Sequence, residues 1–229
     1  MPLLLLAIDT SGKNGSITLA RVTAGRPEVE IVETVPLAGG TFSAQLIPQI
    51  SALLEKHGYS KKDLAAFAAV SGPGSFTGLR VGLAAIKALA EILRKPIAAV
   101  SVLDAIAQSG RSCGRVLAVL DAGRNEVYAG DYEISREQGP PRMHRECLLG
   151  REEFLTEAKG NQVVTPDAAL AEFLQAAGIQ CEHIAHPGSA AVARLGWQRI
   201  ERGETVRPED LEANYIRRSD AEIFSPPKA

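Results

Sequence analysis

The sequence has few aromatic residues, little cysteine and no excess of positive charge. Phe, Trp and Tyr make up 5% of the 229 residues, so the core must be built mainly from Ala, Val, Leu and Ile. The three cysteines, Cys113, Cys147 and Cys181, are widely spaced with no Cys-x-x-Cys pair, which argues against a disulfide framework or zinc knuckle and fits a reducing cytoplasm. A net charge of −2 argues against unaided nucleic-acid binding, which normally needs a strongly basic face.

Long hydrophobic runs are missing as well. The apolar stretch at residues 3–8 has no basic flank, ends at Asp9 and falls well short of the roughly 20 residues that a membrane-spanning helix needs. We interpret it as a buried first strand. With 45% hydrophobic and 23% charged residues, the composition predicts a globular cytoplasmic protein of one large or two small domains, with no membrane association.

Hydrophobic periodicity places the regular elements. Apolar or alternating runs predict strands, and apolar positions at three- and four-residue steps predict helices. The expected strands are 3–8, 16–22, 29–35, 64–70, 97–100, 116–120, 126–134 and 143–149, and the expected helices are 43–57, 79–93, 103–108, 152–159, 168–177 and 189–202.

One pattern occurs twice along the chain. An apolar strand, an Asp, a turn, two further strands and a helix follow one another from near Leu3 and again from near Val116, with Asp9 and Asp121 at matching points. Two such halves predict an α/β fold of two lobes facing each other across a cleft. We expect an N-terminal lobe at 1–109 and a smaller, reduced lobe at 110–229, whose helix 189–202 could pack back on the first.

Residues 71–82 form a glycine-rich turn between a predicted strand and the strongest predicted helix. Either Ser75 or Thr77 can cap that helix, and the free backbone N–H groups at its start could hold an anion. On geometry alone a capped turn is the simpler interpretation. Gly78 and Gly82 lie four residues apart on one face, although glycine inside a helix costs about 1 kcal/mol relative to alanine. Such a face fits close approach by a partner's backbone or by another part of the same chain, and the sequence leaves both open.

Four segments together resemble the TsaB (YeaZ) family, and they follow one another in the family's order over nearly the whole chain. Residues 7–11 read Ala-Ile-Asp-Thr-Ser, and residues 121–128 read Asp-Ala-Gly-Arg-Asn-Glu-Val-Tyr. Residues 214–217 read Asn-Tyr-Ile-Arg. The most specific segment is Ser71-Gly72-Pro73-Gly74-Ser75-Phe76-Thr77-Gly78-Leu79-Arg80-Val81-Gly82.

The resemblance implies the two-part fold of the acetate kinase, Hsp70 and actin superfamily, with mixed sheets and flanking helices. It implies a non-catalytic subunit that pairs with the catalytic subunit TsaD and works with the ATPase TsaE to form threonylcarbamoyladenosine on tRNA. The isolated chain could be a homodimer or a monomer, and the sequence leaves both open. ATP, metal and most tRNA contacts are then expected on the partners, and no cofactor on this chain. The residues that the resemblance assigns to the interface are Gly74, Phe76, Gly78, Arg80, Val81, Gly82, Ala85 and Leu89.

The chain departs from the family pattern in two places. Phe42-Ser43 stands where family members often have His-Ser or His-Thr, which puts a role for that histidine in doubt. The superfamily's glycine-rich adenosine loop is replaced by residues 163–167, Val-Val-Thr-Pro-Asp, which argues against strong nucleotide binding.

A small-molecule kinase or ATPase is the first alternative. Asp9, Ser11 and Asp121 are candidates for a vestigial nucleotide or phosphate site, since paired acids across a cleft can hold Mg²⁺. Each Asp could instead cap its own turn, and we favour that interpretation because no phosphate-binding lysine is obvious.

A peptidase of the glycopeptidase type is the second alternative. The four histidines lack the His-x-x-x-His spacing of TsaD-like metal sites, and we interpret His183 and His186 as surface loop residues. Ser75 and Thr77 have no identifiable base, and a Cys147–His144 dyad rests only on proximity along the chain.

The basic pairs Arg94-Lys95 and Arg217-Arg218 are typical of solvated surface, although the second could extend a partner's tRNA surface.

Overall fold

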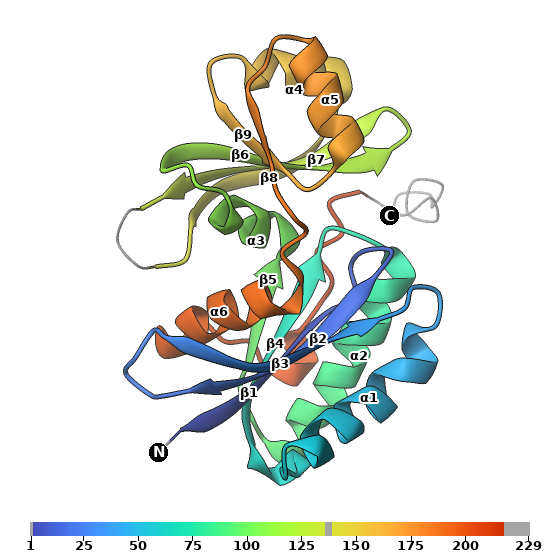
Figure 1. Ribbon diagram of the computed structural model, residues 1–229, viewed down its shortest axis with the longest axis vertical. Helices are drawn as coiled ribbons and strands as arrows, with labels where there is room; N and C mark the ends of the chain where they lie inside the picture. Colours follow the sequence, from blue (N-terminus) through green and yellow to red (C-terminus); the bar gives the residue numbers. More distant parts are fainter. Residues whose placement is uncertain (1, 136–138, 218–229) are drawn as a thin grey trace, which may run out of the picture.

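Two five-stranded mixed sheets, one from each half of the chain, organise the protein (Figure 1). The computed structural model describes residues 2–135 and 139–217, so Arg218 and the tail after it lie outside the described residues. The first sheet has the order β3-β2-β1-β4-β5 and consists of β1 (Leu3–Asp9), β2 (Gly15–Val22), β3 (Val29–Leu37), β4 (Leu64–Gly72) and β5 (Ile97–Ser101). The second has the order β10-β9-β6-β7-β8 and consists of β6 (Gly114–Gly123), β7 (Glu126–Ile134), β8 (Arg142–Gly150), β9 (Gln162–Thr165) and β10 (Cys181–His183).

Helices cover both faces of each sheet. They are α1 (Phe42–Lys56), α2 (Phe76–Leu93), α3 (Val102–Ser109), α4 (Arg151–Ala158), α5 (Ala168–Ala176) and α6 (Gly188–Glu201), with short 3₁₀ turns η1 (Lys61–Asp63) and η2 (Pro208–Asp210). None of the helices in the described ranges is long and apolar enough to cross a membrane.

The internal duplication predicted from the sequence is present in the topology. In each sheet the first three strands form an antiparallel meander, and the next two add in parallel on the other side of the first strand. The second half is shorter, since α5 has 9 residues where α2 has 18, and β10 has only 3. This confirms the predicted two-part α/β fold with a reduced second half.

The uninterrupted apolar run of β1 follows from its central position between β2 and β4. Leu4, Leu6 and Ile8 enter the core under α1 and α2, whereas Leu5 and Ala7 enter the core under α6. Because both faces of the strand are covered, a polar side chain at every second position would be buried at a cost in free energy. The strand ends at Asp9, which it places at the edge of the interlobe cleft.

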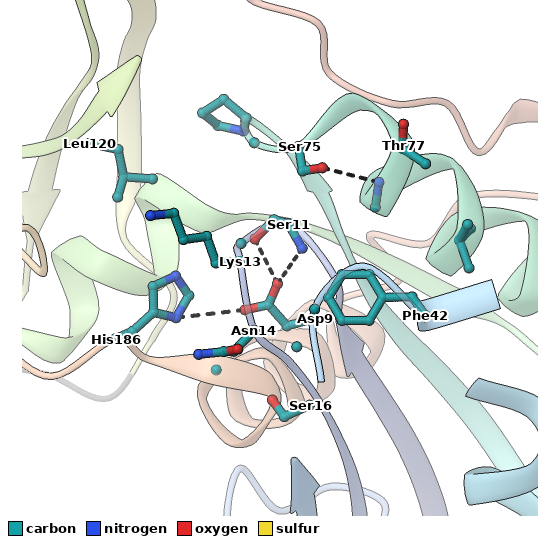
Figure 2. A pocket seen from close by; sticks show the side chains of 18 of the residues that line it. Asp9, Ser11, Lys13, Asn14, Ser16, Phe42, Ser75, Thr77, Leu120 and His186 are labelled. Carbon is teal, nitrogen blue, oxygen red and sulfur yellow. Dashed lines mark hydrogen bonds and ion pairs between the residues drawn. The ribbon is translucent and has the colours of Figure 1, made fainter. Parts of the chain in front are cut away.

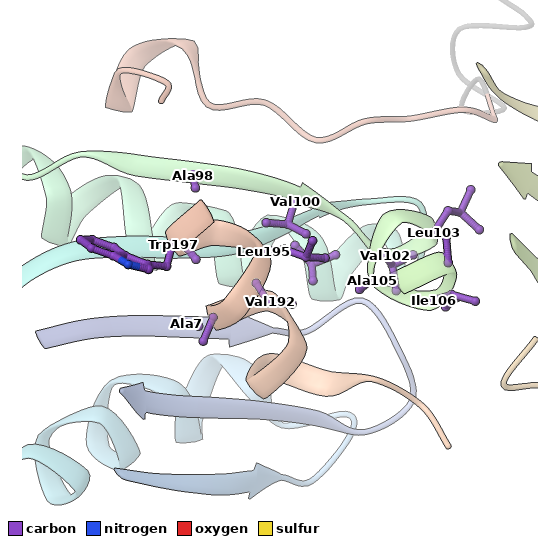
Figure 3. Close-up of a cluster of buried hydrophobic side chains, with 14 of the residues drawn as sticks. Ala7, Ala98, Val100, Val102, Leu103, Ala105, Ile106, Val192, Leu195 and Trp197 are labelled. Carbon is purple, nitrogen blue, oxygen red and sulfur yellow. The ribbon is translucent and has the colours of Figure 1, made fainter. Parts of the chain in front are cut away.

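The last helix of each half of the chain packs on the sheet of the other half. Helix α6 packs over β1, β2, β4 and β5, and α3 packs against β6 and β7 (Figure 3). Gly196 lets α6 approach closely, because an added Cβ would lie 2.4 Å from the Cβ of Ala68. Trp197 is buried and donates from Nε1 to the carbonyl of Arg26 at 2.7 Å. We therefore name two lobes by packing: the first comprises β1–β5 with α1, α2 and α6, and the second β6–β10 with α3, α4 and α5.

The structure differs from the sequence prediction in the second lobe and at the start of α2. Residues 163–165, expected at the position of an adenosine loop, belong to strand β9, and His183, expected in a loop, ends strand β10. Both strands are too short to show a clear period. Helix α2 begins at Phe76 rather than Leu79 because Ser75 caps it, accepting a hydrogen bond from the Gly78 backbone N–H.

Candidate functional site

The turn after β1 and the start of α2 interlock at the mouth of the first lobe. The backbone N–H of Ser75 donates to the Ser11 carbonyl at 2.7 Å, and the Thr10 hydroxyl donates to the Gly78 carbonyl at 2.8 Å. Two of the family-like segments, residues 7–11 and 71–82, are thus held together by direct hydrogen bonds.

The helix glycines serve this intrachain contact. A Cβ at Gly78 would lie 2.1 Å from the Thr10 carbonyl oxygen, and one at Gly82 would lie 2.3 Å from Thr10 Oγ1. A Cβ at Gly74 would meet the Ser11 carbonyl oxygen at 2.5 Å. Both glycines are buried against Thr10, so the close approach that their spacing indicates is made within this chain, and their assignment to a partner interface stays a prediction. The glycine spacing indicates close approach of another backbone without indicating which chain supplies it.

A cavity of about 1250 Å³ lies between the lobes and brings together Asp9, Ser11 and Asp121, as the duplication predicts. Asp9 is buried, and its Oδ1 accepts from the Ser11 N–H at 2.9 Å and from the Ser11 hydroxyl at 2.6 Å (Figure 2). Asp9 thus caps its own turn, as the simpler interpretation expects. Its Oδ2 also lies 3.8 Å from Nδ1 of His186, in the loop before α6.

Asp121 plays a different structural part. Its carboxylate accepts from Arg151 at 3.0 Å, and its backbone N–H donates to Asp167 at 2.7 Å. The expectation that Asp121 caps its own turn is therefore wrong: Arg151, at the first position of α4, takes the carboxylate. Sequence spacing does not reveal either contact of Asp121, because Arg151 and Asp167 lie far from it along the chain.

The cleft also contains a lysine that the sequence argument overlooked. Lys13 lines the cavity together with His186 and Asn14 (Figure 2). Lys13 lies in a turn, and a turn has no regular periodicity from which the direction of a side chain could be predicted. The Lys13 ammonium group could hold an anion, whereas the Asp9 carboxylate could attract a cation. Within residues 2–135 and 139–217, no group of three or more His, Cys, Asp or Glu side chains is close enough to hold a metal ion.

Phe42, which stands where family members often have His, is buried at the start of α1. A Cβ at Gly15 would lie 2.9 Å from the Phe42 ring, so the ring covers the turn between β1 and β2 while lining the cleft. The aromatic side chain supplies packing at this point and no proton-transfer group.

The geometry gives no support to a nucleophilic site at the serine and cysteine considered from the sequence. The Ser75 hydroxyl is used as the α2 cap. Burial raises the pKa of the Cys147 thiol, which lowers its thiolate fraction, and no hydrogen bond joins it to the exposed His144 in the described structure.

The outward face of α2 is a second candidate site. Arg80, Ala84, Ala88 and Ile92 are exposed and follow one another at four-residue steps, and the Ile92 side chain is 73% exposed. The last three of these, Ala84, Ala88 and Ile92, are small or apolar and form a ridge on which another helix can pack. Ile47 of the neighbouring α1 is 53% exposed.

The remaining residues assigned to the interface by resemblance divide between surface and core. Gly74 and Phe76 are exposed, and the Arg80 guanidinium lies 3.8 Å from the centroid of the Phe76 ring. Those that are half-buried and pack on the core of the first lobe are Val81, Ala85 and Leu89.

Comparison with known proteins identifies the family. The family described as TsaD, tRNA N6-adenosine threonylcarbamoyltransferase, matches residues 36–223. The chain is 28% identical to the tRNA threonylcarbamoyladenosine biosynthesis protein TsaB of Escherichia coli over 95% of this chain and 96% of that protein. It is 35% identical to the TsaB protein of Bacillus subtilis, over 56% of this chain and 55% of that protein.

A solved structure agrees with these matches. YeaZ from Pseudomonas aeruginosa superimposes with a TM-score of 0.75 at 27% identity, covering 93% of this chain and 99% of that one. The match therefore extends across both lobes. The chain belongs to the family of TsaD, tRNA N6-adenosine threonylcarbamoyltransferase, and within it to the TsaB (YeaZ) group of the actin-like superfamily.

Proposed function

We propose that this chain is a non-catalytic partner subunit in the formation of threonylcarbamoyladenosine on tRNA. It pairs with a TsaD-type catalytic subunit and works with a TsaE-type ATPase, and it meets tRNA only through that complex. ATP and metal belong to the partner subunits. Two relatives that carry the name tRNA threonylcarbamoyladenosine biosynthesis protein TsaB support this assignment of the process.

One structural observation carries the partner role. The exposed row of Arg80, Ala84, Ala88 and Ile92 lies on the helix that begins in the most specific family-like segment. Alanines at its centre allow the axis of another helix to come near, and Ile92 supplies apolar area that a monomer leaves in water. We place the interface on this row together with Gly74, Phe76, Val81, Ala85 and Leu89. Without a TsaD-type subunit, the same row would pair two copies of the chain.

The test is to mix the purified chain with its cognate TsaD-type subunit and to measure the mass of the complex by light scattering on a sizing column. The proposal predicts a heterodimer that Ala88→Arg weakens, since a long charged side chain would stand in the contact. The matched control is Ala176→Arg, an exposed alanine at the end of α5 in the second lobe.

Two results would count against the interface. If Ala88→Arg and Ala176→Arg bound equally well, the α2 row would not be the contact. If wild-type chain formed no complex at any salt or nucleotide concentration, the partner role itself would be wrong.

A second function, binding of a nucleotide or phosphate group in the cleft, is favoured by one specific observation. Asp9, Ser11 and Asp121 line the same cavity as Lys13. Titration calorimetry with ATP and Mg²⁺ tests this function. The function is supported if the wild-type chain shows a heat of binding and both Lys13→Ala and Asp9→Asn reduce it. The absence of any heat with the wild-type chain would rule this function out.

A further inference from the structure

Residues 211–217, here called the strap, run without regular structure from the first lobe to the second (Figure 1). At its start Leu211 is buried in the core under α1 and α2. At its end Arg217 forms an ion pair with Glu126 of β7. One short segment therefore has its two ends fixed in different lobes.

The middle of the strap is held on the first lobe by backbone and ring contacts. The Asn214 N–H donates to the Ser71 carbonyl at 2.6 Å. The Tyr215 ring lies 5.1 Å from the Phe76 ring, and the Tyr215 hydroxyl accepts from Arg80 Nε at 3.0 Å. These contacts join the strap to the end of β4 and the first turns of α2.

The same residues reach the second lobe through polar side chains. The Asn214 amide donates to Glu146 of β8 at 2.8 Å. The other oxygen of Glu146 accepts from Ser101, at the end of β5, and from Tyr132 of β7. A single carboxylate thus joins the strap, the first lobe and the second lobe. The Arg217 guanidinium also lies 6.0 Å from the Tyr128 ring centroid.

The strap borders the interlobe cleft. A smaller hollow of about 270 Å³ is lined by strap residues and by Pro73, Gly74 and Tyr128. Those three residues also line the large cleft. Strap residues line this hollow rather than the cleft itself, and the hollow adjoins the cleft through the three shared residues. A change in the angle between the lobes would therefore have to displace the strap.

We propose that the strap is a non-covalent tie that sets the separation of the two lobes and so the width of the cleft. The main chain passes between the lobes at two covalent crossings, before α3 and before α6, and α3 also packs against β4, β5 and α6 of the first lobe. The strap adds a third connection, which reaches the second lobe through side-chain contacts. Breaking its contacts with the second lobe leaves the covalent crossings and the packing of α3 as the hinge. This inference concerns the isolated chain and does not rest on the proposed function.

The experiment measures the distance between the lobes by pulsed electron spin resonance. Spin labels are placed at Ser51 of α1 and Glu172 of α5, both exposed, after replacement of the three native cysteines by serine. The test variant carries Asn214→Ala and Arg217→Ala. The control is Arg207→Ala, whose ion pairs with Glu209 and Asp210 stay within one short stretch of chain.

The proposal predicts that the double variant shows a broader distance distribution with a longer mean, whereas the control keeps the wild-type distribution. Glu126→Gln, which breaks the tie from the second lobe, should produce part of the same shift. Circular dichroism and cooperative urea unfolding establish that each variant is folded. An unchanged distribution in folded Asn214→Ala/Arg217→Ala, or an equal shift in the control, would overturn the proposal.

Discussion

Gly82 of α2 faces Thr10 so closely that an added Cβ would lie 2.3 Å from the threonine Oγ1. The Thr10 hydroxyl is fixed by its hydrogen bond to the Gly78 carbonyl and cannot move away freely. We expect Gly82→Ala to lower the free energy of unfolding by about 1–3 kcal/mol, the usual cost of overpacking. Urea unfolding followed by circular dichroism measures this.

The control for that substitution lies on the same helix. Ala84 is exposed, so Ala84→Leu should change stability by less than about 0.5 kcal/mol. If Gly82→Ala were as stable as the wild type, the close contact with Thr10 would be absent in solution. Contact with a partner subunit would then be the better explanation of the two glycines.

Trp197 reports on the packing of α6 across the first sheet. The indole is buried and donates to the Arg26 carbonyl at 2.7 Å. Trp197→Ala should cost about 3–5 kcal/mol through loss of buried surface and the remaining cavity. Trp197→Phe should cost less, because it retains most of the volume and loses the hydrogen bond. Equal stability of all three proteins in urea would mean that α6 does not pack on the sheet in this way.

Asp104 should give the stability a specific pH dependence. Burial raises the pKa of Asp104 from its ordinary 3.8 to about 6, although the ion pair with Arg199 acts in the opposite direction. As pH falls, the folded protein therefore takes up this proton before the unfolded chain does. The stability contribution is fully present below about pH 3.8 and is lost as pH rises through about 6.

A comparison of wild type with Asp104→Asn isolates this contribution. The stability of the wild type relative to the variant should increase by on the order of 1 kcal/mol between about pH 7 and about pH 5. Urea unfolding at both pH values provides the numbers. If the free energy of unfolding changed equally with pH in the two proteins, Asp104 would not titrate in this range.

The three thiols should react at different rates. Cys113 is exposed, whereas burial raises the pKa of Cys181 to about 11 and raises the pKa of Cys147. Because the thiolate is the reactive species, a chromogenic disulfide reagent at neutral pH should modify Cys113 first and the other two slowly. A Cys113→Ser variant should lose the fast phase. A fast phase that survives this substitution would contradict the described burial of the second lobe.

The sequence was sufficient for features that rest on periodicity. The apolar run of β1, the repeat of its pattern at β6 and the helix at α2 were all predicted, because burial on both faces of a strand and one-sided burial of a helix leave direct periodic signals. The strands β9 and β10 escaped because segments of 4 and 3 residues carry too little pattern.

Contacts between distant segments were the part that the sequence could not provide. Lys13, in a turn, shows its direction only in the folded cleft, and the Asp121–Arg151 pair joins different elements. The glycines of α2 indicated a close contact correctly, but the identity of the neighbour, Thr10 of the same chain, depends on the tertiary arrangement.

The central claim is that this chain supports threonylcarbamoyl transfer to tRNA as a subunit without carrying out the reaction itself. The most direct measurement is the amount of threonylcarbamoyladenosine formed on tRNA by the TsaD-type and TsaE-type proteins, given an activated threonylcarbamoyl donor, with and without this chain. The account predicts product when the chain is present, less product with Ala88→Arg, and none from the chain alone. Equal product without the chain, or product from the chain alone, would contradict it.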